Sequence, residues 1–596
     1  MVGSNPQQKQ QSSSDYKVII AYDFGTTYSG AAYAFNHSKK PVEVFDIQNW
    51  CVCGNFYPKV PTLSVYPHYN QEQESKLSQR PTLSEWGHGA KKAMLNPRVA
   101  KQNILLSQFK LHLDESLKCP PLGNGLTPLQ IVADYLTAIH KHTLQELSHG
   151  FANNYHPDTF RYCLTVPAVW SDKAKNLMRQ AAIQAGLITP SDPPDRLELI
   201  SEPEAAALYC EETMTDQVKL KDKDRMMICD AGGGTVDLII FQVNSTKESK
   251  NSSLSRRKIR ELKEVTKGMG ESCGSVFLDD RYRDLLKTKL GENVMNKITP
   301  REMSSMMEYF IDGVKPEFNG VDDFFLELPR SVRMEDLPTR LREDDKEDGF
   351  LEEGILKLSG AELKERVFDP VIDKVLALIE RQYQQIPNGR LDYLFLVGGF
   401  GSSKYLFQRV QQEFHGRKIK QIACPAERAA LAVVRGAAYF GVNPRAVVSR
   451  IAKRFYGINV DAVFDDKIDP TSKRFTKPDG SIRCSGRFHT FVKKNDELPI
   501  DHCVQEKISL FYYGTEESFA INLYATENDS IPRYCDEIGV YRIAKMAITV
   551  PKLKNIKKNK RIALNISMYF GKTEIRMQLE IPATGQKYDV NCDYGL

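Results

Sequence analysis

The sequence has no segment that would insert into a membrane. None of the apolar runs among its 596 residues is long enough to span a bilayer, and the Gln- and Ser-rich residues 1–15 lack the apolar core of a secretion signal. We therefore expect a protein of the cytoplasm, or alternatively of the nucleus, with no membrane partner and a disordered tail at residues 1–15.

Nucleic-acid binding, disulfides and zinc also find little support. The net charge is only +5 and no basic stripe is interleaved with aromatic residues, which argues against a nucleic-acid partner. The twelve cysteines are scattered, and Cys51 and Cys53 form the only close pair, so we expect reduced thiols and no zinc site. The Gly-x-x-x-x-Gly-Lys-Ser/Thr pattern is missing as well, which argues against the ordinary P-loop family of nucleotide-binding proteins.

What the sequence does contain is a glycine-rich turn between two apolar strands. Residues 226–229 and 236–243 are apolar, and between them lie Asp230, Gly232, Gly233, Gly234 and Thr235. This pattern predicts a β-hairpin whose backbone N–H groups curl around a phosphate without Cβ atoms in the way. Asp230 and Asp237 would repel a phosphate, so a bridging cation is implied, Mg²⁺ with its waters. Taken alone, the stretch also reads as a plain glycine-rich hairpin with a capping Asp.

The same plan occurs near the N-terminus. An apolar strand at residues 17–22 ends in Asp23, the turn contains Gly25, Thr26 and Thr27, and residues 30–35 return. The repetition predicts a duplicated lobe, with the two loops facing each other across one nucleotide.

Around the hairpins, helices and strands alternate, and the chain predicts roughly two to four domains. Residues 16–210 read as a first mixed α/β lobe, with a loop-like segment from 51 to about 101, and residues 224–400 as a second lobe closed by helices at 401–440. Alternating strands over 485–596 predict a separate all-β sandwich, and 441–484 is expected to be a linker. The predicted fold class is α/β with a C-terminal all-β domain.

Further candidate residues lie outside the two turns. Ser201 and Glu204 form a capping box around Glu202 at a helix start. A buried strand runs into Gly398 and Gly399, which leave room for a base or ribose, although a simple helix start explains them equally well. Lys110 is a lone lysine in residues 107–114, and a surface lysine is its alternative reading.

Five motifs in this order resemble the heat shock protein 70 family. They are Asp23-Phe-Gly-Thr-Thr-Tyr-Ser29, Val166-Pro-Ala-Val169, Ser201-Glu-Pro-Glu-Ala-Ala-Ala207, Asp230-Ala-Gly-Gly-Gly-Thr-Val-Asp237 and Val397-Gly-Gly-Phe-Gly401. The resemblance is strong over about 16–440 and weak over 485–596. It implies a two-lobed, actin-like (ribonuclease H-like) ATPase domain followed by a β-sandwich that binds polypeptides.

The resemblance also implies roles for individual residues. Positions matching Asp23, Thr26, Thr27, Asp230, Thr235 and Asp237 hold Mg²⁺-bound ATP or ADP and the attacking water in that family, with Asp23 and Asp230 reaching the metal through water. Glu202 would lie near the metal's water shell, and Lys110 would approach the γ-phosphate. The remaining nucleotide-binding positions implied are Gly25, Tyr28, Gly232, Gly233, Gly234, Gly274, Lys315, Gly398, Gly399 and Gly401.

Several departures from the family pattern stand out. The basic helix over the adenine is reduced to the candidate Lys315, and the glycine-rich segment near Gly274 reads Ser272-Cys-Gly-Ser-Val-Phe-Leu-Asp279. The leucine-rich acidic linker is replaced at residues 441–465, and neither a helical lid nor an acidic tail follows the β region. The sequence resembles a divergent, lid-less member.

We therefore expect Mg²⁺-dependent ATP binding with slow hydrolysis, and ATP-controlled binding of polypeptide clients or a protein partner through residues 485–596. The alternative is a non-hydrolysing interaction module whose closure on ATP displays the β region to a partner. A small-molecule kinase or a filament-forming actin relative is disfavoured, because neither requires a C-terminal β domain.

Overall fold

A computed structural model describes most of the chain. The described residues are 16–36, 42–50, 58–68, 80–115, 119–122, 125–151, 156–214, 218, 220–245, 260–346, 348–425, 429–476, 480–513, 515–550, 552–553, 556–557, 560–590 and 592–593. The expected tail at 1–15 and the Cys51–Cys53 pair lie outside them. In the part described, no helix is both long and apolar enough to cross a bilayer.

The chain divides into two compact units. Unit one comprises Met1–Val169, Met178–Lys258 and Gly268–Pro444. Unit two comprises Trp170–Leu177, Ile259–Lys267 and Arg445–Leu596. Unit one mixes helices with sheets, so the predicted α/β class is confirmed.

The first sheet of unit one is built on the N-terminal hairpin. β1 and β2 pair antiparallel, β8 joins β1 in parallel and β9 follows β8, giving the order β3-β2-β1-β8-β9 with β4 on the side of β2. Every residue of β1 is buried, as the apolar run predicts. The strands are β1 (Val18–Asp23), β2 (Tyr28–Phe35), β3 (Val44–Asp46), β4 (Val60–Pro61), β8 (Phe160–Val166) and β9 (Leu197–Ser201).

The second sheet repeats this arrangement. β10 and β11 form the predicted antiparallel hairpin, and β15 joins β10 in parallel, followed by β16. The end of β12, residues Gly268–Glu271, lies beside β11. The strands are β10 (Arg225–Ala231), β11 (Val236–Ser245), β12 (Arg260–Glu271), β15 (Leu391–Val397) and β16 (Ile419–Ala423).

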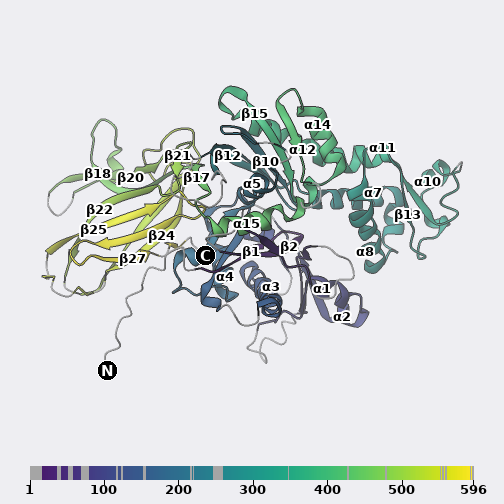
Figure 1. Cartoon of the computed structure of the whole chain (residues 1–596), viewed down its shortest axis with the longest axis horizontal. Helices are drawn as coiled ribbons and strands as arrows, with labels where there is room; N and C mark the ends of the chain where they lie inside the picture. Colours follow the sequence, from purple (N-terminus) through teal and green to yellow (C-terminus); the bar gives the residue numbers. More distant parts are fainter. Residues whose placement is uncertain are drawn as a thin grey trace, which may run out of the picture. The chain divides into compact units, whose positions relative to one another are not determined.

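Two small-residue helices, α5 (Glu202–Thr213) and α15 (Ala432–Val442), pack closely against each other (Figure 1). A Cβ atom on Gly436 would overlap the carbonyl oxygen of Ala205, so the backbones touch. Helix α5 contacts strands of both sheets, which places it between them. The other main helices are α3 (Pro128–Phe151), α4 (Asp172–Gln184), α7 (Val276–Met295), α8 (Pro300–Tyr309), α12 (Asp369–Gln384) and α14 (Lys404–Phe414).

Two segments hold more structure than the sequence suggested. The range 51–101 is expected to be loop-like apart from a short helix starting at 86–92, which is present as α1 (Gly87–Met94). It also carries α2 (Pro97–Gln102) and strands β5 (Leu63–Pro67) and β6 (Glu85–Trp86), and β5 pairs with both β6 and β7 (Asn103–Ser107). Within the second lobe, β13 (Phe324–Glu327) pairs with β14 (Ile355–Leu358). The short strands were missed because paired strands need only alternate side chains to be apolar.

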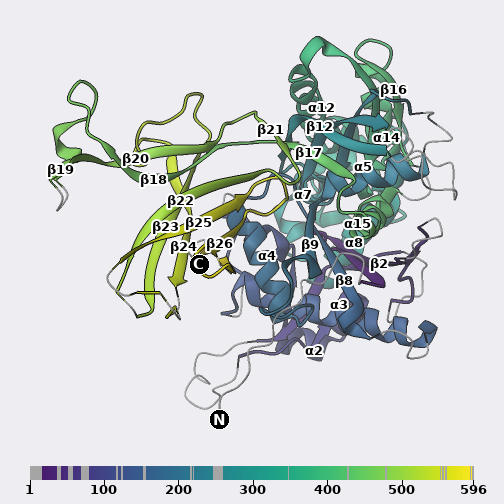
Figure 2. The same ribbon diagram turned by 60° about the vertical axis from the view of Figure 1, so that its left-hand side comes forward.

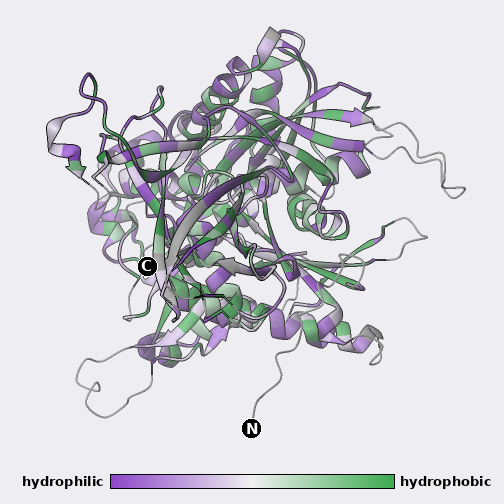
Figure 3. Ribbon diagram, turned by 90° about the vertical axis from the view of Figure 1, so that its left-hand side faces the viewer, coloured by the Kyte–Doolittle hydropathy of each residue, from purple (hydrophilic) through white to green (hydrophobic). Residues whose placement is uncertain are grey.

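Unit two is built from two larger antiparallel sheets. One has the order β19-β20-β18-β23-β24-β28, and the other β22-β25-β26-β27 (Figure 2). Hydrophobic and hydrophilic residues follow one another along many strands (Figure 3). In β24 and β26, buried residues alternate with more exposed ones. The main strands are β18 (Phe455–Val463), β20 (Ile482–Val492), β22 (Cys503–Tyr512), β23 (Glu517–Thr526), β24 (Val540–Val550), β25 (Lys560–Tyr569), β26 (Arg576–Ile581) and β27 (Gln586–Val590).

The expected linker at 441–484 is wrong in part. This range carries β17 (Val447–Ile451), which pairs with the first part of β12 and with β21 (Glu497–Pro499), and β18, which is a central strand between β20 and β23. Buried residues from both large sheets, such as Leu523 and Leu564, belong to one core with Ile458 of β18. In β18 apolar Ile458, Val460 and Ala462 alternate with polar Asn459 and Asp461, a strand signal that the expectation of a linker overlooked.

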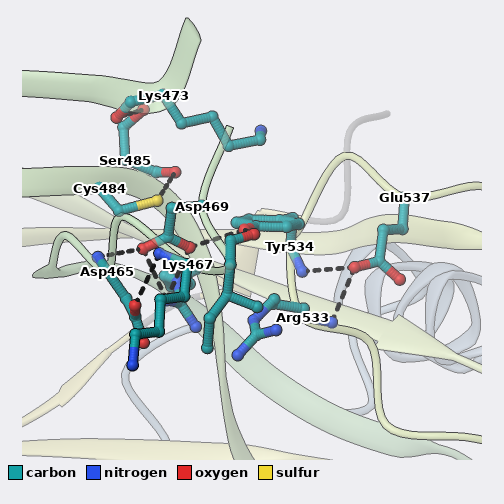
Figure 4. A network of polar contacts seen from close by, with 11 residues as sticks. Asp465, Lys467, Asp469, Lys473, Cys484, Ser485, Arg533, Tyr534 and Glu537 are labelled. Carbon is teal, nitrogen blue, oxygen red and sulfur yellow. Dashed lines mark hydrogen bonds and ion pairs between the residues drawn. The ribbon is translucent and has the colours of Figure 1, made fainter. Parts of the chain in front are cut away.

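A polar network joins the segment after β18 to the middle of β20 and to the segment before β24. The Asp469 carboxylate, wholly shielded from solvent, accepts hydrogen bonds from the Arg487 guanidinium, the Tyr534 hydroxyl at 2.6 Å and the Asp465 backbone N–H at 2.8 Å (Figure 4). The Glu537 carboxylate accepts from the N–H groups of residues 533 and 534.

Candidate functional site

The first hairpin turn is fixed by a short strap, residues 58–62. The Thr62 N–H donates to the Thr27 carbonyl at 2.8 Å, and the Thr62 hydroxyl donates to the Gly25 carbonyl at 2.8 Å. Strand β4 within the strap pairs with β2, with Pro61 opposite Tyr28. Asp23, the last residue of β1, lies opposite Gly30. The turn is thereby held in one conformation beside Asp23.

The second turn is closed by its own backbone and by the start of α7. The Gly232 N–H donates to the Thr235 carbonyl at 3.0 Å, and Asp230 lies opposite Asp237 across the hairpin. The backbone N–H groups of residues 274–276 donate to the carbonyls of Gly234, Gly232 and Gly233. A Cβ atom on Gly274 would overlap the Gly233 carbonyl, so glycine is needed there.

The structure brings the two turns directly together. A Cβ atom on Gly233 would lie 2.8 Å from Thr27 Cγ2, and one on Gly234 would lie 2.7 Å from Thr26 Oγ1. Real Cβ atoms do not approach other atoms this closely, so only glycine permits this contact. Two turns about 200 residues apart in sequence therefore share one site.

Four buried carboxylates, Asp23, Glu202, Asp230 and Asp237, lie around the joined turns. Burial, followed by the charges of the other three, raises the pKa of Asp230 well above its usual range. Burial also raises the pKa of Glu202 to about 7, against the opposing charge of Lys110. The Asp237 carboxylate accepts from the Val169 N–H at 3.3 Å.

Two lysines reach this cluster. Lys110, in a short 3₁₀ helix at Phe109–Leu113, is buried and its ammonium is ion-paired with Glu202. Lys59 donates to Asp23 Oδ2 at 2.5 Å, while the Thr165 hydroxyl donates to Asp23 Oδ1 at 3.1 Å. Sequence reasoning missed Lys59, because one lysine in a short Pro-flanked segment carries no local signal. With all six groups ionised, the four carboxylates and two ammonium groups have a net formal charge of −2.

The glycines after β15 lie beside the same cluster. Gly398 has a positive φ of 84°, and a Cβ atom there would lie 2.5 Å from Asp230 Oδ1. A Cβ atom on Gly399 would meet nothing within 4 Å, whereas one on Gly401 would lie 3.3 Å from the backbone of Leu396. Gly398 is thus required by its approach to Asp230.

Lys315 is placed with a different partner. Its ammonium, in helix α9 (Lys315–Glu317), donates to Asp279 Oδ1 of α7 at 2.7 Å. Burial lowers the pKa of Lys315, while the Asp279 carboxylate opposes that shift. Its predicted role on the adenine side stays a prediction.

The donor set fits a hydrated cation better than a directly bound one. Among the described residues, no group of three or more Asp, Glu, His or Cys side chains is arranged to hold a metal ion. Asp23 and Asp230 nevertheless share one buried cluster with excess negative charge, which suits Mg²⁺ surrounded by most of its waters.

A mixed α/β chain in which two strand–Asp–Gly–Thr hairpins meet fits an actin-like ATPase of the heat shock protein 70 type. No family model matches the chain. Human heat shock 70 kDa protein 12A is 25% identical to it over 655 residues, which cover 97% of this chain and 92% of the relative. Human heat shock 70 kDa protein 12B is 24% identical over 669 residues, covering 99% and 93%.

A bacterial relative extends the similarity. Chaperone protein DnaK of Elusimicrobium minutum (strain Pei191) is 22% identical over 332 residues, covering 55% of this chain and 46% of the relative. The resemblance to the heat shock protein 70 family is confirmed: the chain's homologues over nearly its full length are members of that family.

Proposed function

We propose that this protein binds ATP with Mg²⁺ between the two hairpin turns and hydrolyses it slowly, in the manner of an actin-like ATPase with two lobes. The observation that supports this most directly is the contact of Gly233 and Gly234 with Thr27 and Thr26, next to the buried pair Asp23 and Asp230. Polyphosphate bound there would meet backbone N–H groups and hydroxyls from both turns.

Each residue of the cluster has a distinct part in the proposal. Asp23 and Asp230 would hold Mg²⁺ through its waters, and that ion would neutralise charge on the phosphates. Lys110 would stabilise the charge that develops on the terminal phosphoryl group, since phosphoryl transfer depends mainly on positioning and electrostatics. Glu202, paired with Lys110, would orient that lysine and accept hydrogen bonds from water. Asp237, held by the Val169 N–H, would help to position the attacking water.

The β region is proposed to bind polypeptide under the control of the nucleotide. This proposal is supported by the homologous proteins, two of which are named heat shock proteins and one a chaperone. It would operate in the cytoplasm, where ATP and unfolded polypeptides are both present.

Phosphate release from ATP by the purified chain tests the proposal, with Asp23→Ala as the inactive control. Release that depends on Mg²⁺ and is lost in the variant supports an ATPase. Tight ATP binding without release would instead favour the non-hydrolysing interaction module. No ATP binding at all, measured by calorimetry, would refute both.

A further inference from the structure

Lys59 is held in place by the strap that fixes the first turn. The strap is joined to the Gly25–Thr27 turn by two hydrogen bonds of Thr62 and to β2 by strand pairing. The aliphatic part of Lys59 packs against Gly30, where a Cβ atom would lie 3.2 Å from Lys59 Cγ. This packing directs the ammonium group inward to Asp23.

The ammonium lies where a cation is expected in the proposed nucleotide site. It is 2.5 Å from Asp23 Oδ2, and Lys59 is only 8% exposed. The other carboxylate oxygen, Oδ1, accepts from Thr165, so a direct partner contacts each oxygen of Asp23. The charge of Lys59 also opposes the rise in the pKa of Asp230, so it acts on both carboxylates proposed to anchor the metal.

We propose that Lys59 is a built-in cation of the nucleotide site, which competes with a divalent ion for Asp23 and reduces the dependence of nucleotide binding on Mg²⁺. The inference rests on the proposed function. Lysine carries a compact point charge on a flexible stem, so the ammonium can turn from the carboxylate to a phosphate oxygen without moving the backbone. In a buried site such a charge acts strongly, because little water screens it.

The test compares ATP affinity with Mg²⁺ and with EDTA in the full-length protein, using Lys59→Met, which keeps the apolar stem and removes the charge. The parent should bind ATP under both conditions with affinities within about tenfold. Lys59→Met should lose a further factor of about 10 to 100 in EDTA, the size of one charge-assisted hydrogen bond, and little with Mg²⁺. Lys297→Met, which removes an ion pair of 2.6 Å with Asp336, is the matched control and should behave as the parent.

A second measurement follows the cation directly. Mn²⁺ binding to the nucleotide-free protein, observed by electron paramagnetic resonance, should become tighter in Lys59→Met, because Asp23 loses its resident ammonium. A variant damaged only in its packing would bind Mn²⁺ more weakly or equally. If Lys59→Met does not fold, Lys59→Gln serves in both measurements.

If the ratio of the ATP affinity with Mg²⁺ to that in EDTA is the same in Lys59→Met as in the parent, the inference is overturned. It is also overturned if the Mn²⁺ affinity of Lys59→Met does not exceed that of the parent. If the parent binds no ATP even with Mg²⁺, the proposed function fails. The Mn²⁺ titration still decides the role of Lys59 in that case.

Discussion

Gly233 lies against Thr27 so closely that a Cβ atom on the glycine would stand 2.8 Å from the threonine Cγ2 and nearer still to its Oγ1. The two turns are therefore in contact as they stand. Gly233→Ala should push them apart and lower ATP affinity by about tenfold, a cost on the order of 1–2 kcal/mol. Calorimetry with ATP measures this. Gly313→Ala, where a Cβ atom meets nothing within 4 Å, is the control, and equal affinities in the two variants would contradict the prediction.

Lys110→Ala should slow phosphate release by about 10²–10³, the cost of losing one preorganised charge-stabilising group. ATP affinity should stay nearly unchanged. The variant should also unfold at a lower temperature, because Glu202 loses its buried partner. In Lys110→Ala/Glu202→Gln the unfolding temperature should recover while phosphate release stays slow. Unchanged turnover in the single variant would remove Lys110 from the site.

Asp230→Asn should weaken nucleotide binding without lowering the stability of the protein. Burial and the neighbouring carboxylates raise the pKa of Asp230 well above its usual range, so without a metal ion its ionised form is disfavoured in the folded protein, and Asn removes that charge. Thermal unfolding without nucleotide should therefore be unchanged or slightly raised. Mg·ATP affinity should fall by at least about tenfold, since Asn cannot supply the charge that holds the cation. Calorimetry that gives the parental affinity would exclude Asp230 as an anchor.

Glu202 should make the stability of the nucleotide-free protein depend on pH. Its folded pKa, raised to about 7 mainly by burial, exceeds the ordinary value of 4.5, so the folded state binds more protons between these values. The contribution of Glu202 is fully present below pH 4.5 and is lost as the pH rises towards 7. Relative to Glu202→Gln, the parent should lose up to about 3 kcal/mol across this window in urea unfolding. Parallel curves for the two proteins would show that Glu202 does not titrate in this range.

Asp469 in unit two should contribute to folding stability with the opposite dependence on pH. Hydrogen bonds from Arg487, Tyr534 and the Asp465 N–H hold the pKa of this carboxyl below its usual range against the effect of burial. Its stabilising contribution is therefore present above the ordinary pKa and is lost as the pH falls through the folded value. Asp469→Asn should lower the thermal unfolding temperature at pH 7 and change it less at pH 3. Tyr534→Phe, which removes one of the three donors, should give a smaller loss. An equal loss at both pH values would contradict this assignment.

Local pattern was enough to predict the parts of the fold that repeat. Asp23 and Asp230 each end an apolar strand before a Gly/Thr turn, and both hairpins are present as predicted. The capping box of Ser201 and Glu204 is also confirmed. In each case neighbouring residues alone determine the geometry, so the sequence suffices.

What the sequence could not predict depends on tertiary contacts. Lys59 acquires its partner only because strand pairing brings the strap to Asp23, and Lys315 meets Asp279 only because α7 and α9 pack together. The hydrogen bonds from the start of α7 to the glycine turn also depend on tertiary packing.

The contact of α5 with α15 has a mechanical consequence. Gly436 and Ala205 meet backbone to backbone, so no side chain separates the two helices at this point. Helices packed this closely can slide past each other by small amounts, which is the shear type of conformational change. Because α5 touches both sheets of unit one, a small slip of these helices would move the two hairpin turns relative to each other without unpacking either sheet.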